Sequence, residues 1–193
     1  MFPWFSFLTY AVITAVTPGP NNIMSMSNGS RRGFCGALPF NFGIWTGFSA
    51  VMILCTAFCG LLSALIPKIK LPMLILGAAY MLYLAWETFR SGGVEEDHSR
   101  DGFLSGLLLQ FVNPKIYIYC IMSMEAYILP FYHSRPLPLF GFALLLAFIG
   151  FVFTLCWSAF GSLFKRLFSR HARPVNTVMA LLLVYCAVSL FLA

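Results

Sequence analysis

Two prolines, a glycine and two asparagines interrupt the apolar run that opens the chain. They form the segment Thr17-Pro18-Gly19-Pro20-Asn21-Asn22. Proline removes a backbone donor and clashes with the preceding helical turn, and glycine also disfavours helix. A helix passing through this run is therefore expected to break here. Backbone freed by such a break inside a bilayer is tolerated only beside protein or water.

A second interruption lies in the fourth apolar run, at Asn113-Pro114-Lys115, shortly after Gln110. Lys115 would carry its charge at mid-span, which is costly, so an ionisable residue at this depth indicates function. Interrupted membrane helices at corresponding places in two halves of a chain are typical of a solute site near the bilayer midplane.

The chemistry expected at the paired breaks is recognition of a zwitterion. The free N–H groups and partial positive charge at the start of each second half-helix suit a carboxylate, and Lys115 adds a full charge. Amide and hydroxyl groups, together with freed carbonyls, suit an amino group. The candidate substrate-binding residues are Thr17, Pro18, Gly19, Pro20, Asn21, Asn22, Gln110, Asn113, Pro114, Lys115 and Tyr185.

Structural roles compete with these assignments. Lys115 could pair with an acid or cap freed carbonyls, and Asn22 and Asn113 could serve backbone repair alone. Glu125 is the candidate for proton coupling if buried, although ten residues beyond Lys115 place it ~15 Å along a helix, near the interface. Among tyrosines at helical spacing, Tyr83 and Tyr185 are the candidates to line a cavity, and the others are interpreted as packing.

Composition determines the elements that must position these residues. The chain is 60% hydrophobic and 9% charged, with a mean hydropathy of +0.86. Long uncharged runs in such a chain indicate transmembrane helices. We predict an all-α membrane protein with one transporter domain over 1–193 and six transmembrane helices, the first and fourth broken near the midplane. The expected helices are 4–27, 37–63, 71–90, 103–129, 137–163 and 175–192.

The two halves of the chain, about 1–92 and 101–193, echo each other weakly. Leu54-Cys55 precedes Gly60 as Leu155-Cys156 precedes Gly161, and the two breaks fall in the first helix of each half. Three helices per half would reverse the second copy across the membrane, which predicts two inverted repeats. Gly43-x-x-x-Gly47 in the second helix is interpreted as a helix-packing face.

Basic residues give the expected orientation. The first, third and fifth loops hold eight Lys and Arg residues, whereas the second and fourth hold three. The excess of positive charge faces the cytoplasm, which places both termini in the periplasm. The net charge of +6 follows from this distribution and does not indicate nucleic-acid binding. The sequence leaves the oligomeric state open.

Other function classes find little support. The chain has six cysteines without a Cys-x-x-Cys pair, and its three histidines fall in loops. No metal site, cofactor or general base is therefore predicted. A membrane-embedded thiol redox enzyme is retained as the alternative to transport because of the number of cysteines.

Three motifs resemble the LysE/RhtB family of amino-acid exporters. They are the run at 17–22, Gln-Phe-Val-Asn-Pro-Lys at 110–115, and Leu-Leu-Leu-Val-Tyr-Cys-Ala-Val at 181–188. The resemblance covers essentially the whole chain. It implies a bacterial inner-membrane protein that exports small neutral amino acids, such as cysteine and O-acetylserine, in exchange for protons. Many family members carry an acidic residue where this chain has Phe48, so no proton carrier is assigned there.

Overall fold

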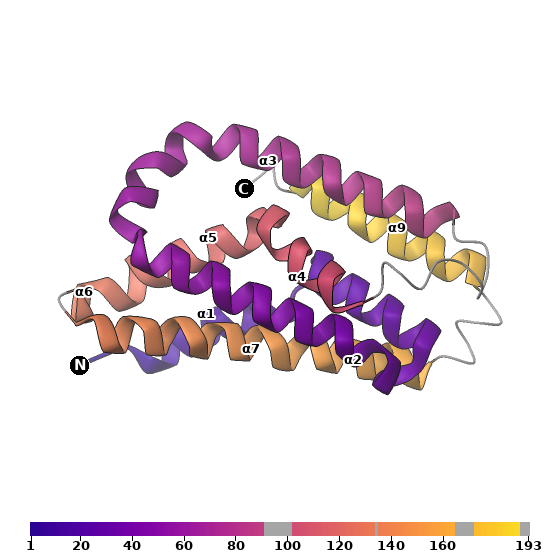
Figure 1. Ribbon diagram of the computed structural model, residues 1–193, viewed down its shortest axis with the longest axis horizontal. Helices are drawn as coiled ribbons and strands as arrows, with labels where there is room; N and C mark the ends of the chain where they lie inside the picture. Colours follow the sequence, from indigo (N-terminus) through magenta and orange to yellow (C-terminus); the bar gives the residue numbers. More distant parts are fainter. Residues whose placement is uncertain (91–101, 134, 165–171, 190–193) are drawn as a thin grey trace.

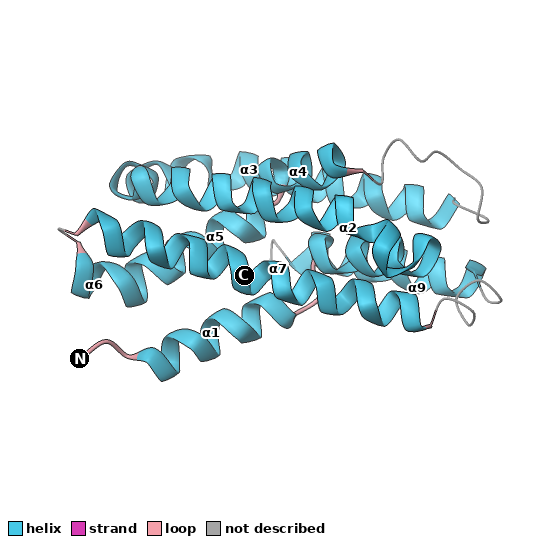
Figure 2. Cartoon of the chain, turned by 60° about the horizontal axis from the view of Figure 1, so that its bottom comes forward, coloured by secondary structure: helices cyan, strands magenta, loops and turns pink. Residues whose placement is uncertain are grey.

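The computed structural model describes residues 1–90, 102–133, 135–164 and 172–189, and these residues are almost entirely helical (Figure 2). The helices run roughly along one long axis of the molecule (Figure 1). Within the described ranges there is no strand. The expected all-helical class is therefore confirmed.

The first expected helix is broken as its prolines predict. Helix α1 spans Trp4–Val16, and helix α2 spans Pro20–Ala57. Thr17 follows α1 with an extended ψ of 142°, and Gly19 precedes α2 in extended backbone. Pro20 occupies the first turn of α2, where its missing N–H is not needed.

Gly33 divides α2 into two helices that fold back on each other. Its φ of 76° lies in the left-handed region that favours glycine. The chain reverses at this point in Figure 1. A hydrogen bond of 2.8 Å from Ser25 Oγ to Asn41 Oδ1 joins the two arms. The arms match the second half of the first expected helix and most of the second.

The expected boundary between the second and third helices is wrong. We predicted an interruption over 64–70, but α2 ends at Ala57 and helix α3 runs continuously over Cys59–Arg90. Pro67 and Pro72 thus lie inside a helix. Figure 1 shows the early part of α3 curving, which is the usual effect of proline in a helix that does not end.

The fourth expected helix is also broken. Helix α4 spans Phe103–Val112, Asn113 interrupts the backbone, and helix α5 spans Pro114–Ser123. A π-helical turn η2, Met124–Ile128, and the short helix α6, Leu129–Tyr132, complete this run. The axis of the run Pro114–Tyr132 is bent by 64° from that of α4. Helices α7, Pro136–Leu163, and α9, Ala172–Ser189, follow closely the last two expected ranges.

Glycines allow close backbone packing between helices. A Cβ atom at Gly43 or Gly106 would collide with the carbonyl oxygen of Phe103 or Phe40, where the second arm of α2 packs on α4. A Cβ at Gly29 or Gly161 would collide with Ser158 or Met26, where the first arm of α2 packs on α7. The Gly43-x-x-x-Gly47 motif therefore has the packing role that we expected. Helix α9 packs along α3 (Figure 1).

Two apolar clusters form the core of the described residues. One joins α1, the end of α2, α5 and α7, with Phe7, Met52 and Leu146 among its buried members. The other joins both arms of α2 to α3, α4 and α9, with Ile23, Met81 and Leu183 among its buried members. At the first break, α1 packs in the first cluster and the first arm of α2 in the second. At the second break, α4 packs in the second cluster and α5 in the first.

Length and composition identify fewer complete spans than predicted. Among the described residues, α2 and α7 are long and apolar enough to cross a membrane, and the bent pair Phe103–Val112 and Pro114–Tyr132 adds a third if it is one span. Trp4–Val16 and Arg173–Val188 are shorter apolar helices. Three predicted features lie outside the described residues. They are the polar loop over 91–101, the repeat limits 92, 101 and 193, and the basic residues within 165–171.

Gly29→Ala tests the close packing of α2 on α7. The added Cβ would meet the Ser158 backbone, so the helices must separate, and we expect a loss of ~1–3 kcal/mol in stability. The control Gly141→Ala places its Cβ in open space on α7 and should be neutral or stabilising. Thermal unfolding in detergent measures both variants, and an unchanged midpoint for Gly29→Ala would contradict this packing.

Candidate functional site

The two helix breaks lie against each other and share a network of amide side chains. Asn21 Nδ2 donates to Gln110 Oε1 at 2.8 Å, and Gln110 Nε2 donates back to Asn21 Oδ1 at 3.1 Å. Asn113 Nδ2 donates to the same Asn21 oxygen at 3.2 Å. Gln110 is fully buried and Asn113 is nearly so. The network therefore ties the first break directly to the second.

Asn22 and Asn113 also repair the backbone at the breaks. Asn22 Nδ2 donates to the carbonyls of Ala15 and Thr17 at 2.8 and 2.9 Å, which helix α1 leaves free at its end. Asn113 Oδ1 accepts from the Lys115 backbone N–H at 3.1 Å and so caps α5. The structural role that we considered for these two residues is thus observed.

Lys115 reaches from the second break to the first. Its Nζ donates to the Thr17 carbonyl at 3.1 Å and to Thr17 Oγ1 at 2.9 Å. A Cβ atom added at Gly19 would lie 3.2 Å from the same nitrogen. Within the described residues, no carboxylate is bonded to this ammonium group. Lys115 therefore caps a carbonyl freed at the other break.

A cavity opens where the two second half-helices begin. Its empty space is about 430 Å³ when the open mouth is included. Gly19, Pro20, Asn21 and Asn22 line it from α2, and Asn113 and Lys115 line it from the second break. Both helix N-termini therefore border one cavity, as the sequence predicts.

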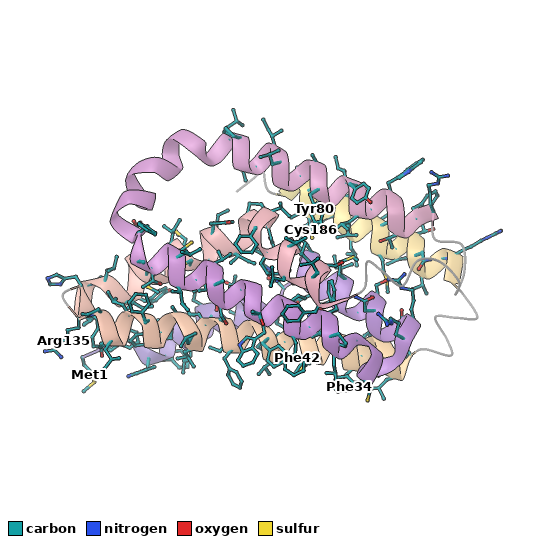
Figure 3. The ribbon with its side chains drawn as sticks, viewed as in Figure 1. Met1, Phe34, Phe42, Tyr80, Arg135 and Cys186 are labelled. Carbon is teal, nitrogen blue, oxygen red and sulfur yellow. The ribbon has the colours of Figure 1, made fainter. Side chains whose placement is uncertain are left out.

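The remaining candidates lie behind the cavity or away from it. Three candidates adjoin the lining without belonging to it, namely Thr17, Gln110 and Pro114. Pro18 lies exposed between α1 and α2. Tyr185 is 66% exposed and does not line this cavity. Its neighbour Cys186 faces inward instead and donates from Sγ to the Pro18 carbonyl at 3.8 Å. Figure 3 labels Cys186, which packs in the same cluster as Tyr80.

Glu125 does not reach the cavity. It lies in the π-helical turn η2, is exposed, and is absent from the cavity lining. The condition of burial that we set for proton coupling is thus not met. Tyr83, the other tyrosine that we considered for a cavity, is 47% exposed on α3.

Several lining residues were missed from sequence. They are Thr14, Ala15, Phe48, Ile116, Tyr119, Gly150 and Thr154. Tyr119 follows Lys115 by four residues, and residues with this spacing share a helix face, so this spacing was a usable signal. Helix α7, which supplies Gly150 and Thr154, is apolar on all sides, so no stripe indicated which face turns inward.

A buried polar cluster lies farther along α2 and α7. Asn41 Nδ2 donates to Ser158 Oγ at 2.7 Å, and Ser158 Oγ donates to the Ser25 carbonyl at 2.9 Å. All three residues are fully buried. The cluster joins both arms of α2 to α7, so it fixes the helices that border the cavity.

Comparison with known proteins now identifies the family. The model of the LysE type translocators matches residues 12–193. The chain belongs to this family. It is 40% identical to the cysteine/O-acetylserine efflux protein of Salmonella choleraesuis strain SC-B67 and 42% identical to that of Klebsiella pneumoniae. The first alignment covers 96% of this chain and 96% of the relative. The second covers 95% of this chain and 94% of the relative. No solved structure matches the chain.

Membership of the LysE family makes the chain a transporter and not an enzyme. The structure nevertheless brings together two cysteines that sequence spacing did not pair. The buried thiols of Cys55 on α2 and Cys120 on α5 are hydrogen-bonded to each other, and neither is in a disulfide. The redox alternative is therefore set aside on the ground of family and not for lack of neighbouring thiols.

A double-mutant cycle on Asn21→Ala and Gln110→Ala tests the link between the breaks. Each change removes both bonds between the two amides and leaves one polar atom of the remaining amide unpaired, so each should cost ~1–3 kcal/mol in stability. Because the two residues share both bonds, their effects should couple by ~0.5–3 kcal/mol. Denaturant unfolding in detergent measures the cycle.

Thr46→Ala combined with Asn21→Ala is the matched control for this cycle. Thr46 Oγ1 donates only within its own helix, to the Phe42 carbonyl. The two control changes should therefore add to within ~0.5 kcal/mol. If the stability losses of Asn21→Ala and Gln110→Ala also add to within ~0.5 kcal/mol, the breaks are not coupled.

Proposed function

We propose that this LysE-family protein is a secondary active exporter of small neutral amino acids, with cysteine and O-acetylserine as its cargo. It would move them from the cytoplasm to the periplasm in exchange for protons, in a bacterial inner membrane. The observation that carries the proposal is one cavity bordered by two helix N-termini and Lys115. The cargo follows the names of relatives that are 40% and 42% identical.

The carboxylate of the amino acid would bind at the start of the two second half-helices. Backbone N–H groups in the first turn of α2 have no intrahelical partner. At the start of α5 the Lys115 N–H is already capped by Asn113 Oδ1, so this end would contribute mainly its partial positive charge. Lys115 Nζ would exchange part of its bonding to Thr17 for the carboxylate, which supplies stronger, charge-assisted hydrogen bonds. Gly19 would let the carboxylate approach the backbone closely.

The amino group would bind on the acceptor side of the same cavity. The Ala15 residue lines the cavity, its carbonyl accepts one side-chain hydrogen bond from Asn22, and a carbonyl oxygen can accept a second. Gln110 and Asn113 would hold Asn21 in place through the amide network. The side chain would then point to the wall formed by Phe48, Ile116 and Tyr119.

A neutral cargo agrees with the charges of the cavity. Lys115 is the charged residue of the lining, and among the described residues no acidic side chain borders the cavity. A cargo with a cationic side chain would place two positive groups in a low-dielectric site without a counter-charge, which is costly.

Helix pairing supports six spans in two inverted repeats. A twofold exchange of the halves would relate α1 to α4, the first arm of α2 to α5, and the second arm of α2 to α7. The second arm of α2 packs on a half-helix of the second break through Gly43 and Gly106, and α7 packs on a half-helix of the first break through Gly161 and Gly29. The same exchange would relate α3 to α9, which pack on each other. Alternating access would move these repeats about the breaks at the membrane midplane.

Lys115→Ala and, separately, Asn113→Ala should abolish efflux. The first removes the charge at the cavity, and the second removes both the α5 cap and a bond to Asn21. Export of labelled cysteine and O-acetylserine from loaded proteoliposomes, with and without a pH gradient, measures the effect. Thr46→Ala is the control and should transport normally, with equal protein recovered in the membrane. Full transport by both test variants would refute the proposed roles.

Thiol labelling tests the expected orientation. Cys35 lies exposed shortly after the turn at Gly33, in the proposed cytoplasmic loop region. With the other cysteines replaced, a membrane-impermeant maleimide should label Cys35 only after the cells are opened. A His133→Cys reporter in a cysteine-free chain should label in intact cells. The opposite pattern would place the termini in the cytoplasm.

A further inference from the structure

Tyr119 belongs to the cavity wall but takes no part in the polar network of the breaks. It lies on α5, one turn beyond Lys115, and only 3% of its surface is exposed. Its ring packs beside those of Phe48 and Tyr10, with centroids 6.0 Å away in each case. The ring is therefore held between α1 and the second arm of α2, with one side on the cavity.

The Tyr119 hydroxyl has no hydrogen-bond partner among the described residues. Buried tyrosine hydroxyls usually find a partner, because an unpaired polar group loses its hydration without compensation. Phenylalanine would fill the same space without this cost. A hydroxyl at this position therefore requires an explanation outside the packing of the protein.

We propose that the Tyr119 hydroxyl recognises the side chain of the cargo by donating a hydrogen bond to its sulfur or oxygen atom. This inference rests on the proposed function and assigns the residue that determines side-chain selectivity. One helical turn separates Tyr119 from Lys115, a rise of about 6 Å. That separation matches the length of a small amino acid whose carboxylate lies at Lys115.

The hydroxyl would distinguish cargo by chemistry and not by size. Cysteine and O-acetylserine both present an acceptor atom on the side chain, whereas 2-aminobutyrate has a methyl group in place of the thiol. With 2-aminobutyrate bound, the hydroxyl would stay unpaired. A site built around a hydrogen bond rejects an analogue that cannot make it, because the buried polar group is left without a partner.

Tyr119→Phe tests this role. Proteoliposomes loaded with equal cysteine and 2-aminobutyrate report the ratio of their initial efflux rates, and O-acetylserine against norvaline gives a second ratio. The variant should lose about 2- to 10-fold of the preference for the cargo with the acceptor atom, as expected from one neutral hydrogen bond. Efflux of 2-aminobutyrate should be unchanged or faster, and the thermal midpoint should be equal or higher, because an unpaired buried hydroxyl is removed.

Two variants serve as matched controls. Ser123 follows Tyr119 by one turn, is fully buried and also has an unpaired hydroxyl, but it does not line the cavity. Tyr117 also lies outside the lining, and its hydroxyl donates to the Phe111 carbonyl at 3.1 Å. Ser123→Ala and Tyr117→Phe should both leave the selectivity ratios at the wild-type value.

The outcomes separate this inference from the proposed function. Wild-type protein that exports none of the amino acids would refute the proposed function itself. Wild-type export with unchanged ratios in Tyr119→Phe would refute only the role of Tyr119. A lower thermal midpoint with equal loss for every cargo would also overturn it, because the hydroxyl would then be structural.

Discussion

The backbone groups freed at the two helix breaks must be paired, because a membrane interior offers no water to replace a lost helical bond. Each break supplies the groups that the other needs. Lys115, from the second break, caps the Thr17 carbonyl of the first, and Asn21, from the first, binds Gln110 and Asn113 beside the second. Asn22 and Asn113 also repair the backbone of their own breaks, so each break combines local capping with bonds to the other. A conformational change that moves one must rearrange the other, and this dependence gives a transporter a natural point of coupling between its two halves.

The packing around the breaks favours movement of whole helix pairs over deformation of single helices. Glycine contacts hold the first arm of α2 on α7 and the second arm on α4 at a separation that admits no added Cβ. The apolar clusters are separate, and each gathers helices from both halves of the chain. Packed interiors resist continuous deformation, so changes concentrate where regular packing stops. In this protein that place is the cavity. Its polar side chains are hydrogen-bonded to the protein, and the proposed zwitterionic cargo would replace some of these bonds.

The sequence predicted the features that local chemistry determines and missed those that depend on which way a helix faces. Prolines at 18, 20 and 114 break helices because glycine or asparagine beside them favours extended backbone and supplies capping groups. Pro67 and Pro72 lack such neighbours and lie within α3, so proline alone was a poor boundary signal. The cavity residues Gly150 and Thr154 lie on α7, which has apolar residues on every side, so no amphipathic pattern indicates direction.

Phe48 shows how one residue limits the chemistry of the cavity. Its ring lies against Gly150, where a Cβ atom would collide with it, so the glycine on α7 makes the space that the ring fills. An acidic residue at this position would border the same cavity as Lys115 and offer a partner for a second positive group on the cargo. The phenyl ring offers dispersion and no charge. The cavity thus holds one cation and two electropositive helix ends, a balance that suits a zwitterion whose side chain adds no charge of its own.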